Sequence, residues 1–285
     1  MMKKIILMAE TGSDITPELA VQYGIEIVPM HVNFDSETLD DGAFPVEKIT
    51  EYYNTTRKLP KTSGSTVSDF EKKFDEVHEK WPEAHILYLA YSAVTTCSYQ
   101  SALIAMEDRD YVTAIDTKQV SVGQGAVVVE VARMLQNNPQ MELEQVIDKT
   151  KDIIEHAKMC FVPDNLEFLH AGGRVSNAAF LGAQILNLHP CIEILDGKLI
   201  ATKKYRGRMR KVVGKLIEDY AASYKLKKDE LWFVYTIGLA EKVKEAAEDT
   251  ARECGFKNIR WIQAAGVITT HGGPAAFGLA GFSEK

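Results

Sequence analysis

Hydroxyl side chains gather at a point where a predicted strand ends and a predicted helix begins. This hydroxyl cluster consists of Ser92, Thr95, Thr96 and Ser98. The apolar run at 86–89 is typical of a strand buried on both faces, and from residue 99 apolar side chains recur at helical spacing. Because a helix N-terminus carries unpaired N–H groups and positive potential, hydroxyls added there suit a phosphate or a carboxylate. The simpler alternative is that one hydroxyl caps the helix and the others face water.

Two other hydroxyl-rich turns, at 11–14 and 62–66, also lie between predicted elements. The first follows a predicted strand at 3–9, and the second precedes a helix whose start is marked by the capping-box pair Ser68 and Glu71. Strands that alternate with helices imply right-handed crossovers and a mostly parallel sheet, in which ligands bind at the carboxyl ends of the strands. All three turns fall at that edge, so their convergence favours a ligand site over isolated helix caps.

The sequence predicts an α/β fold in two domains. Residues 1–158 alternate strands with helices, which indicates a mostly parallel sheet with flanking helices, whereas residues 159–285 mix helices with a hairpin in an α+β domain. The predicted strands are 3–9, 25–34, 86–89, 111–115, 191–195, 198–205, 231–237, 258–262 and 266–269. The predicted helices are 17–23 (capped by Thr16, with Pro17 as its first residue), 45–53, 68–80, 99–106, 121–135, 141–158, 165–170, 177–187 (capped by Ser176), 208–224 and 240–254.

Composition limits the classes of function. The chain has 285 residues, of which 46% are hydrophobic and 26% charged, and a net charge of −7, which argues against a large nucleic-acid or anionic-membrane footprint. No apolar run reaches the roughly 18 residues of a membrane span, and the short apolar start is a first strand rather than a signal peptide. The four cysteines are scattered without a CxxC pair, which indicates reduced thiols in a cytoplasmic protein and no zinc site.

Common catalytic motifs do not occur in the sequence. There is no GxxxxGK[ST] phosphate loop, and the glycine pattern that begins at Gly123 lacks the third glycine of the dinucleotide fingerprint. Neither HExxH nor GxSxG is present, and no acidic pair has the spacing of an acid/base couple. A hydrolase that used the hydroxyl cluster would need a histidine, and His271 is the one histidine in a glycine-rich setting.

Six motifs, in order along nearly the whole chain, resemble those of the DegV family, the fatty-acid-binding proteins that serve bacterial fatty acid kinases. They are Thr11-Gly12-Ser13-Asp14; Lys61-Thr62-Ser63; Ser92 with Thr96 to Ala102; Asp116-Thr117 with Ser121, Gly123 and Gly125; Asp164 to Glu167 with Gly172 to Ser176; and Pro190, Asp196-Gly197-Lys198 and Arg206 with His271 to Gly278.

The resemblance implies a two-domain α/β protein with an acyl chain in a tunnel between the domains. The carboxylate-binding hydroxyls of the family fall on Thr62 and Thr96, with Ser63, Ser92 and Ser98 as supporting groups and His271 beside the head group. A carboxylate held by hydroxyls over a helix N-terminus needs no metal and no nearby arginine. The tail would supply most of the affinity, at about 0.8 kcal/mol per buried methylene.

The resemblance also implies a partner. Arg174 and Arg206 match family arginines on the face that meets the kinase, where they would attract an acidic surface or steady the transferred phosphate; the alternative is that both are ordinary solvated arginines. The sequence departs from the family at Gly64-Ser65, where a Gln-Pro pair is usual, and at Thr96-Cys97, where Ser-Gly is usual. A third departure is Ala275 in place of a glycine.

We therefore expect a cytoplasmic protein that binds a long-chain fatty acid and presents it to a separate fatty acid kinase catalytic subunit. It would have no catalytic residues of its own, no metal and no cofactor besides the bound fatty acid, no nucleic-acid partner and at most transient membrane contact. Two alternatives stay open. One is an enzyme that holds a small phosphorylated substrate at the same turns, and the other is a lipid buffer or sensor without a kinase.

Overall fold

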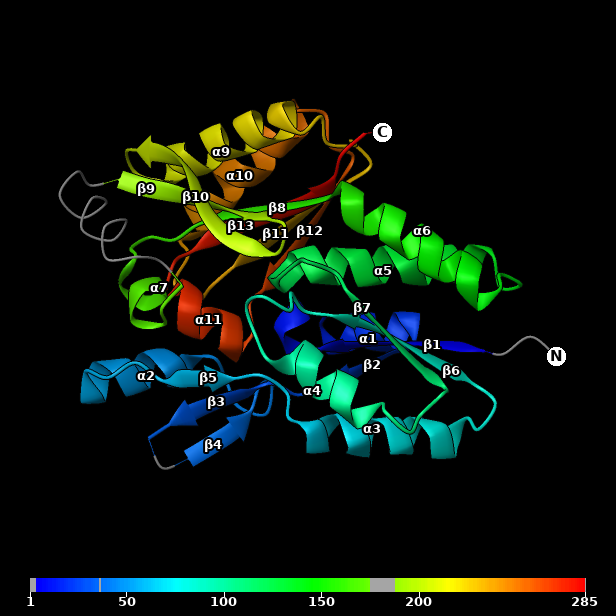
Figure 1. Cartoon of the computed structure of the whole chain (residues 1–285). Coiled ribbons are helices and arrows are strands. Elements are labelled where there is room, and N and C mark those ends of the chain that lie inside the picture. Colours follow the sequence, from blue (N-terminus) through cyan, green and yellow to red (C-terminus); the bar gives the residue numbers. More distant parts are fainter. Residues whose placement is uncertain (1–3, 36, 175–187, 285) are drawn as a thin grey trace.

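A four-stranded parallel sheet, sheet A, lies at the lower right of the molecule in Figure 1. The computed structural model describes residues 4–35, 37–174 and 188–284. The strands of sheet A, in spatial order, are β2 (Ile25–Val28), β1 (Ile5–Glu10), β6 (His85–Ala90) and β7 (Val112–Asp116). Every residue of β6 is buried, as its uninterrupted apolar sequence predicts for a central strand covered on both faces. The predicted parallel sheet is thereby confirmed.

Helices cover both faces of sheet A. They are α1 (Pro17–Tyr23), α3 (Val67–Lys80), α4 (Ser98–Ala105) and α5 (Ser121–Asn137). Alternate residues of the central strands separate the two cores: Ile86 and Tyr88 pack with α3 and α4, whereas Leu87 and Leu89 pack with α1 and α5. Thr16 caps α1 ahead of Pro17, as the sequence predicts.

A six-stranded mixed sheet, sheet C, forms the core of the other half of the molecule. Its strands, in spatial order, are β10 (Lys198–Arg206), β9 (Leu188–Leu195), β8 (Ala157–Val162), β13 (Phe277–Phe282), β11 (Glu230–Tyr235) and β12 (Asn258–Gln263). The predicted hairpin is confirmed as β9 and β10, and its turn residues Asp196 and Gly197 both have positive φ, as a type I′ turn requires. The α/β fold with a second, mixed-sheet part is therefore as expected.

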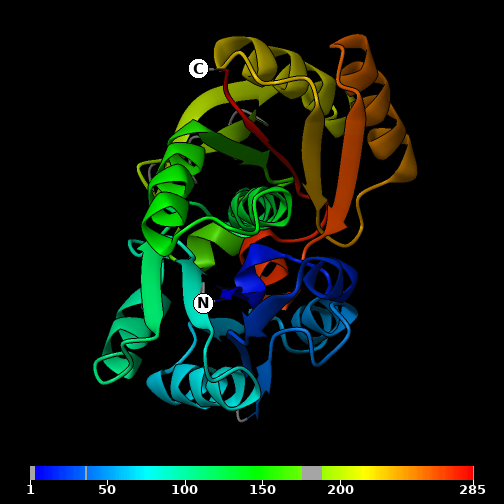
Figure 2. The same cartoon turned by 90° about the vertical axis from the view of Figure 1, so that its right-hand side faces the viewer.

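Helix α5 lies between the two sheets. One face of sheet C is covered by α9 (Met209–Ser223) and α10 (Glu241–Glu253), and its other face packs on α5 and α6 (Leu143–His156). Figure 2 shows α5 end on, between the strands of sheet C above and those of sheet A below. We keep the division at 158/159 as a proposal, since sheet A is built entirely from residues before it and all of sheet C except the start of β8 from residues after it.

A small antiparallel sheet, sheet B, completes the wall beside the cavity described below. Its strands, in spatial order, are β4 (Glu37–Asp40), β3 (His31–Phe34) and β5 (Lys61–Ser63). Three helices pack near it: α2 (Glu47–Thr56), α7 (Glu167–Ala171) and α11 (Gly266–Gly272). Sheet B and α11 share a core that includes Val32, Ile49 and Val267, so a helix from the C-terminal part of the chain packs against strands from the N-terminal part.

Three expectations about the elements are wrong. The segment 266–269 is not a strand but the start of α11, because Asp41 Oδ1 accepts the N–H groups of Gly266 (2.7 Å) and Val267 (3.2 Å) and so caps the helix from a distant loop. The extended segment 25–34 is two strands, β2 and β3. Strands β4, β5, β8 and β13 were not predicted. The predicted helix 177–187 and its cap Ser176 lie outside the described residues.

Candidate functional site

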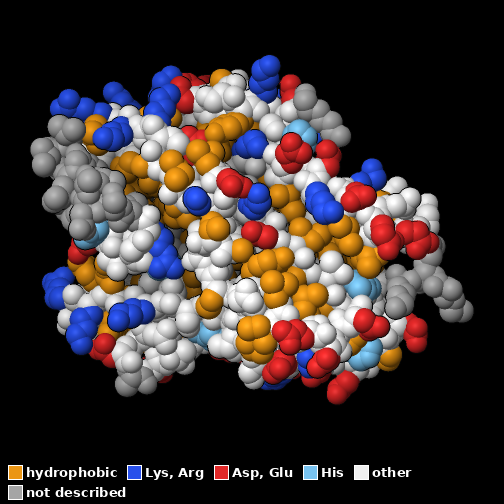
Figure 3. All heavy atoms as spheres, in the orientation of Figure 1, with side chains coloured by type: hydrophobic (Ala, Val, Ile, Leu, Met, Phe, Trp, Pro, Cys, Tyr) orange, Lys and Arg blue, Asp and Glu red, His pale blue; other side chains and the backbone are white. Residues whose placement is uncertain are grey.

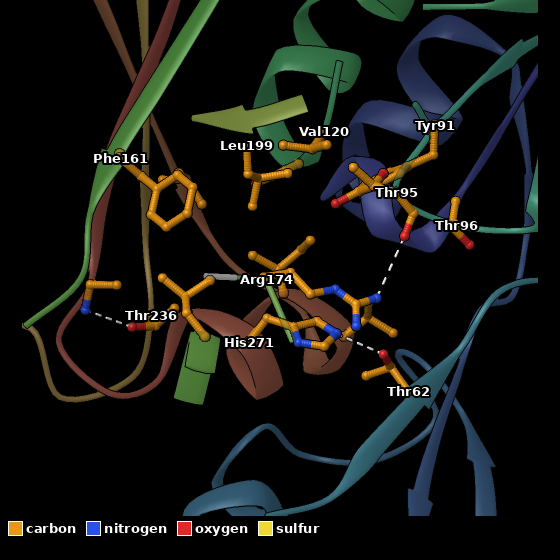
Figure 4. Close-up of a pocket in the computed structure, with 18 of the residues that line it drawn as sticks. Thr62, Tyr91, Thr95, Thr96, Val120, Phe161, Arg174, Leu199, Thr236 and His271 are labelled. Carbon is orange, nitrogen blue, oxygen red and sulfur yellow. Dashed lines mark hydrogen bonds between the residues drawn. The ribbon is translucent and has the colours of Figure 1, made fainter. Parts of the chain in front are cut away.

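A pocket lies between sheet C, the hydroxyl cluster and sheet B. The space between its walls, including the open mouth, is about 860 Å³. Most of its wall is apolar, and the side chains come from elements of both halves: Met30, Val120, Met159, Phe161, Leu169, Leu199, Val234, Val267, Ile268, Ala276 and Phe277. Thr62, Thr96, Arg174 and His271 lie at one end in Figure 4, whereas the hydroxyl of Thr236, on the side of Phe161, is already bonded to the backbone of Gly273 and Ala276. The pocket is therefore amphipathic.

Thr62 and His271 meet at the polar end. Thr62 lies on β5 and His271 near the end of α11, and Thr62 Oγ1 is 2.7 Å from His271 Nε2 (Figure 4). Burial, reinforced by the positive charge of Arg174, lowers the pKa of His271 to about 3. The ring is therefore neutral at physiological pH, so it offers a ligand a hydrogen-bonding nitrogen and no net charge.

Thr96 lines the same end from the loop that precedes α4. Its Oγ1 lies 3.2 Å from Ser98 Oγ and accepts a long hydrogen bond (3.4 Å) from the N–H of Ser98, the first residue of α4. Ser98 Oγ in turn accepts the N–H of Ser65 at 3.1 Å. The N-cap residue of α4, Cys97, makes no side-chain cap hydrogen bond, and Ser92 and Ser98 are buried, so the simpler alternative of one cap with the other hydroxyls in water is not what the structure has. Thr96 faces the pocket.

Gly64 is in contact with this hydroxyl pair. A Cβ built on Gly64 would lie 2.5 Å from Thr96 Oγ1 and 2.6 Å from Ser98 Oγ. No side chain fits there unless the hydroxyls move. Gly64 and Thr96 are both positions at which the sequence departs from the family pattern, and they are neighbours. The absence of a side chain at Gly64 leaves room for the side chain of Thr96.

The predicted site residues divide into two groups. Thr62, Ser63, Thr96 and His271 line the pocket. Ser92 and Ser98 do not: both are buried, and Ser92 Oγ donates to the carbonyl of Gly197 at 2.8 Å, which ties the hydroxyl cluster to the β9–β10 hairpin. The turns at 62–66 and 92–98 contribute to the polar end, whereas the turn at 11–14 has no residue in the pocket wall.

Arg174 lies elsewhere than expected. The family resemblance implied a partner-facing position for it, and a carboxylate over a helix N-terminus was expected to need no arginine, yet Arg174 lines the pocket between Thr95 and His271 (Figure 4). Its guanidinium donates to the carbonyls of Thr95 (3.5 Å) and Gly172. The Gly172-Gly173-Arg174 motif does not show where the Arg174 side chain points, because that direction depends on how α7 packs. Arg206, at the end of β10, is exposed.

Two buried carboxylates to which the sequence analysis gave no role in the site, Asp14 and Asp41, hold the helix that carries His271. Asp41 caps α11 as described above, and Asp14 Oδ1 accepts the N–H of Ala265 at 2.8 Å while its Oδ2 accepts the hydroxyl of Ser121 at 2.5 Å. Burial raises the pKa of both acids, that of Asp14 to about 7. The motif at 11–14 therefore holds the start of α11 in place and does not itself contact a ligand in the pocket.

The described residues contain neither a candidate metal site nor a helix that could span a membrane. Within residues 4–35, 37–174 and 188–284, no three His, Cys, Asp or Glu side chains are grouped so that they could hold a metal ion. Over the same ranges, every helix is too short or too polar to cross a bilayer.

The fold and pocket define a class: an α/β protein with an apolar cavity that ends in hydroxyls, a neutral histidine and an arginine. The sequence pattern of the DegV family, described as a family of uncharacterised proteins, matches residues 4–284. The chain belongs to the DegV family. A fatty acid-binding protein of Thermotoga maritima is 27% identical over 292 residues, which cover 97% of this chain and 96% of that protein. A DegV domain-containing protein of Caldanaerobacter subterraneus is 28% identical over 290 residues, with full coverage of both.

Solved structures agree with this assignment. A DegV family protein from Thermus thermophilus, described by its fatty acid binding, superposes with a TM-score of 0.87 and 26% identity over 99% of this chain and 100% of that one. The fatty acid kinase (Fak) B3 protein of Streptococcus pneumoniae, loaded with linoleic acid, has a TM-score of 0.85 at 16% identity over 99% and 100% of the two chains. This second likeness is one of fold.

Proposed function

We propose that this protein binds a long-chain fatty acid in the pocket between its two sheets. The observation that carries the proposal is one cavity with a mostly apolar wall, in which Thr62, Thr96, Arg174 and His271 lie together at one end. Each methylene buried against that wall contributes about 0.8 kcal/mol, so a chain of more than ten carbons accounts for most of a tight affinity.

The polar end suits a carboxylate. The hydroxyls of Thr62 and Thr96 and the neutral ring of His271 supply hydrogen bonds, with Ser63 beside them and Arg174 providing the opposite charge. Hydrogen bonds to a charged group contribute about 1.5–3 kcal/mol each, more than bonds between neutral groups. The relatives from Thermotoga maritima and Thermus thermophilus, both described as fatty-acid-binding, support this assignment.

We further propose that the protein presents the carboxylate to a separate fatty acid kinase catalytic subunit and has no catalytic activity alone. In this proposal the bound fatty acid takes the place of a cofactor, the protein acts in the cytoplasm, nucleic acid is no partner and membrane contact is transient. The exposed Arg206 supports a face that meets an anionic partner. The Fak B3 protein of Streptococcus pneumoniae, which shares the fold, is named for such a kinase.

The rival of another class is an enzyme acting on a small phosphorylated substrate. That reading expects a polar cleft, and the mostly apolar pocket wall favours the fatty acid instead. A lipid buffer without a kinase would have the same pocket, and the two are separated by assaying acyl-phosphate formation with the cognate kinase.

Mass spectrometry of the natively purified protein tests the binding proposal. We expect a long-chain fatty acid to co-purify with, or be loadable into, the wild-type protein. A Thr62→Ala, Thr96→Ala double variant should fold but lose the ligand. A protein that never takes up fatty acid, but is stabilised by sugar phosphates or nucleotides, would contradict the proposal.

A further inference from the structure

A second hollow adjoins the polar end of the pocket. It lies between α7 on one side and β5 with the segment 57–60 on the other, and it shares with the pocket the residues Thr62, Gly172, Arg174 and His271. We call this hollow the cationic groove. Any group attached to a carboxylate bound at Thr62 and His271, on the side away from the apolar wall, would enter it.

The walls of the cationic groove are fixed to each other. Tyr53 of α2 donates its hydroxyl to Glu167 Oε1 of α7 at 2.6 Å, and its ring packs 5.3 Å from that of Phe168. Arg57 follows α2 in a left-handed conformation, with φ of 59° and its N–H bonded to the carbonyl of Tyr53 at 2.8 Å. The groove is therefore a built feature of the contact between α2 and α7.

Positive charge is in excess in the groove. Arg57, Lys58, Lys61 and Arg174 line it, against the carboxylates of Asp35 and Glu167. Both carboxylates already have partners, since Asp35 pairs with Lys58 at 3.1 Å and Glu167 accepts from Tyr53. Within the described chain neither Arg57 nor Lys61 forms an ion pair, and both are exposed.

This arrangement is unusual in a chain of net charge −7. In Figure 3, Lys and Arg side chains lie along the left of the molecule, the side on which α2 and α7 lie in Figure 1, as well as across its top and centre. Unpaired cations attract an anion, and a guanidinium can bind two phosphate oxygens at once. Because His271 is neutral, the positive charge near the head group comes from Arg174 and from the other cationic side chains of the groove.

We propose that the cationic groove holds the phosphoryl group of an acyl phosphate, with Arg57 and Lys61 as its binding residues. The inference rests on the proposed fatty-acid function. In the step it serves, a carboxylate oxygen forms a bond to the terminal phosphorus of a nucleoside triphosphate held by the kinase. The bond from that phosphorus to the bridging oxygen breaks, and the electron pair leaves with the nucleoside diphosphate. The new phosphoryl group lies beyond the carboxyl carbon, where the groove begins.

Two ligands with the same tail test the proposal. One is hexadecanoate, and the other is 2-oxoheptadecylphosphonate, in which a methylene replaces the bridging oxygen of hexadecanoyl phosphate. Isothermal titration with the delipidated full-length protein gives both affinities. We expect an Arg57→Gln, Lys61→Gln double variant to bind the phosphonate about tenfold or more weakly, with the hexadecanoate affinity changed less than about twofold. The loss should shrink at high salt.

Lys242→Gln is the matched control, because Lys242 is an exposed lysine on α10 that lines neither hollow. It should change neither affinity. If the double variant binds both ligands as the wild type does, or weakens both equally, the groove is not a phosphoryl site although the fatty-acid proposal stands. If the wild type binds neither ligand, both proposals fail.

Discussion

Thr62 Oγ1 lies 2.7 Å from His271 Nε2, although the two residues are 209 positions apart in the sequence. Thr62 belongs to sheet B and His271 to α11. Residues from the N-terminal and C-terminal parts of the chain therefore meet at the polar end of the pocket. Because the histidine is neutral, with a pKa of about 3, the pair can exchange donor and acceptor roles around a ligand without a change of charge. Whatever moves α11 therefore moves half of the candidate head-group site.

Gly172 leaves the space that the His271 ring occupies. A Cβ built on Gly172 would overlap His271 Nδ1 and lie 2.9 Å from Cε1, whereas its φ of −76° suits any residue. We expect Gly172→Ala to push the ring away from Thr62, to weaken fatty-acid binding about tenfold and to reduce the free energy of unfolding by about 1–3 kcal/mol. Titration calorimetry and urea unfolding measure the two effects.

Gly214→Ala is the control for that substitution. Gly214 lies inside α9, where the nearest atom to an added Cβ is Thr250 Oγ1 at 3.1 Å, far from the pocket wall. Alanine favours a helix interior by up to about 1 kcal/mol over glycine, but Thr250 Oγ1 must shift slightly to admit the Cβ, so the free energy of unfolding should change by no more than about 1 kcal/mol and the fatty-acid affinity should stay that of the wild type. Equal fatty-acid affinities for the wild type and Gly172→Ala would contradict the assigned place of His271.

Asp41 anchors the start of α11 through two backbone N–H groups. Asp41→Ala would leave both donors unpaired, at about 1–3 kcal/mol in the free energy of unfolding, and would release the helix that carries His271. Asp41→Asn keeps an acceptor oxygen and should retain most of the stability and the fatty-acid affinity. Chemical unfolding of both variants, combined with ligand titration, checks this order. Identical behaviour of the alanine and asparagine variants would show that the cap is dispensable.

Asp14 makes stability depend on pH. Burial raises its pKa to about 7 from an ordinary 3.8, so between these values the folded state binds more protons than the unfolded state. The free energy of unfolding contributed by this group therefore falls as pH rises from about 4 to about 7, by up to about 1.4 kcal/mol per pH unit, and is level above that. Asp14→Asn removes the titration, so its stability relative to the wild type should rise across this range. A difference that stays constant with pH would rule out the perturbed carboxyl.

Local signals in the sequence predicted much of the fold. The buried strand β6, the cap and Pro17 at the start of α1, and the Asp196-Gly197 hairpin each depend on neighbouring residues, and each is present. Helix α11 was misassigned because its cap, Asp41, is 225 positions away and its Val-Ile-Thr-Thr run is typical of a strand.

The parts of the fold and the site that the sequence did not predict depend on tertiary packing. Strand β13 is rich in glycine, and a Cβ on Gly278 would lie 2.9 Å from Phe161 Cβ and from Val234 Cγ1, so its glycine serves close packing that no local pattern reveals. Within the candidate site, the turns at 62–66 and 92–98 were found from their hydroxyls. The position of Arg174 and the supporting roles of the buried acids depend on contacts across the molecule.

A structure of the protein after incubation with hexadecanoic acid tests the central claim most directly. We predict the carboxylate within hydrogen-bonding distance of Thr62, Thr96 and His271, and the tail along Phe161, Leu199 and the rest of the apolar wall. An unoccupied pocket at saturating fatty acid, or a tail that lies elsewhere with the carboxylate remote from these three side chains, would contradict it.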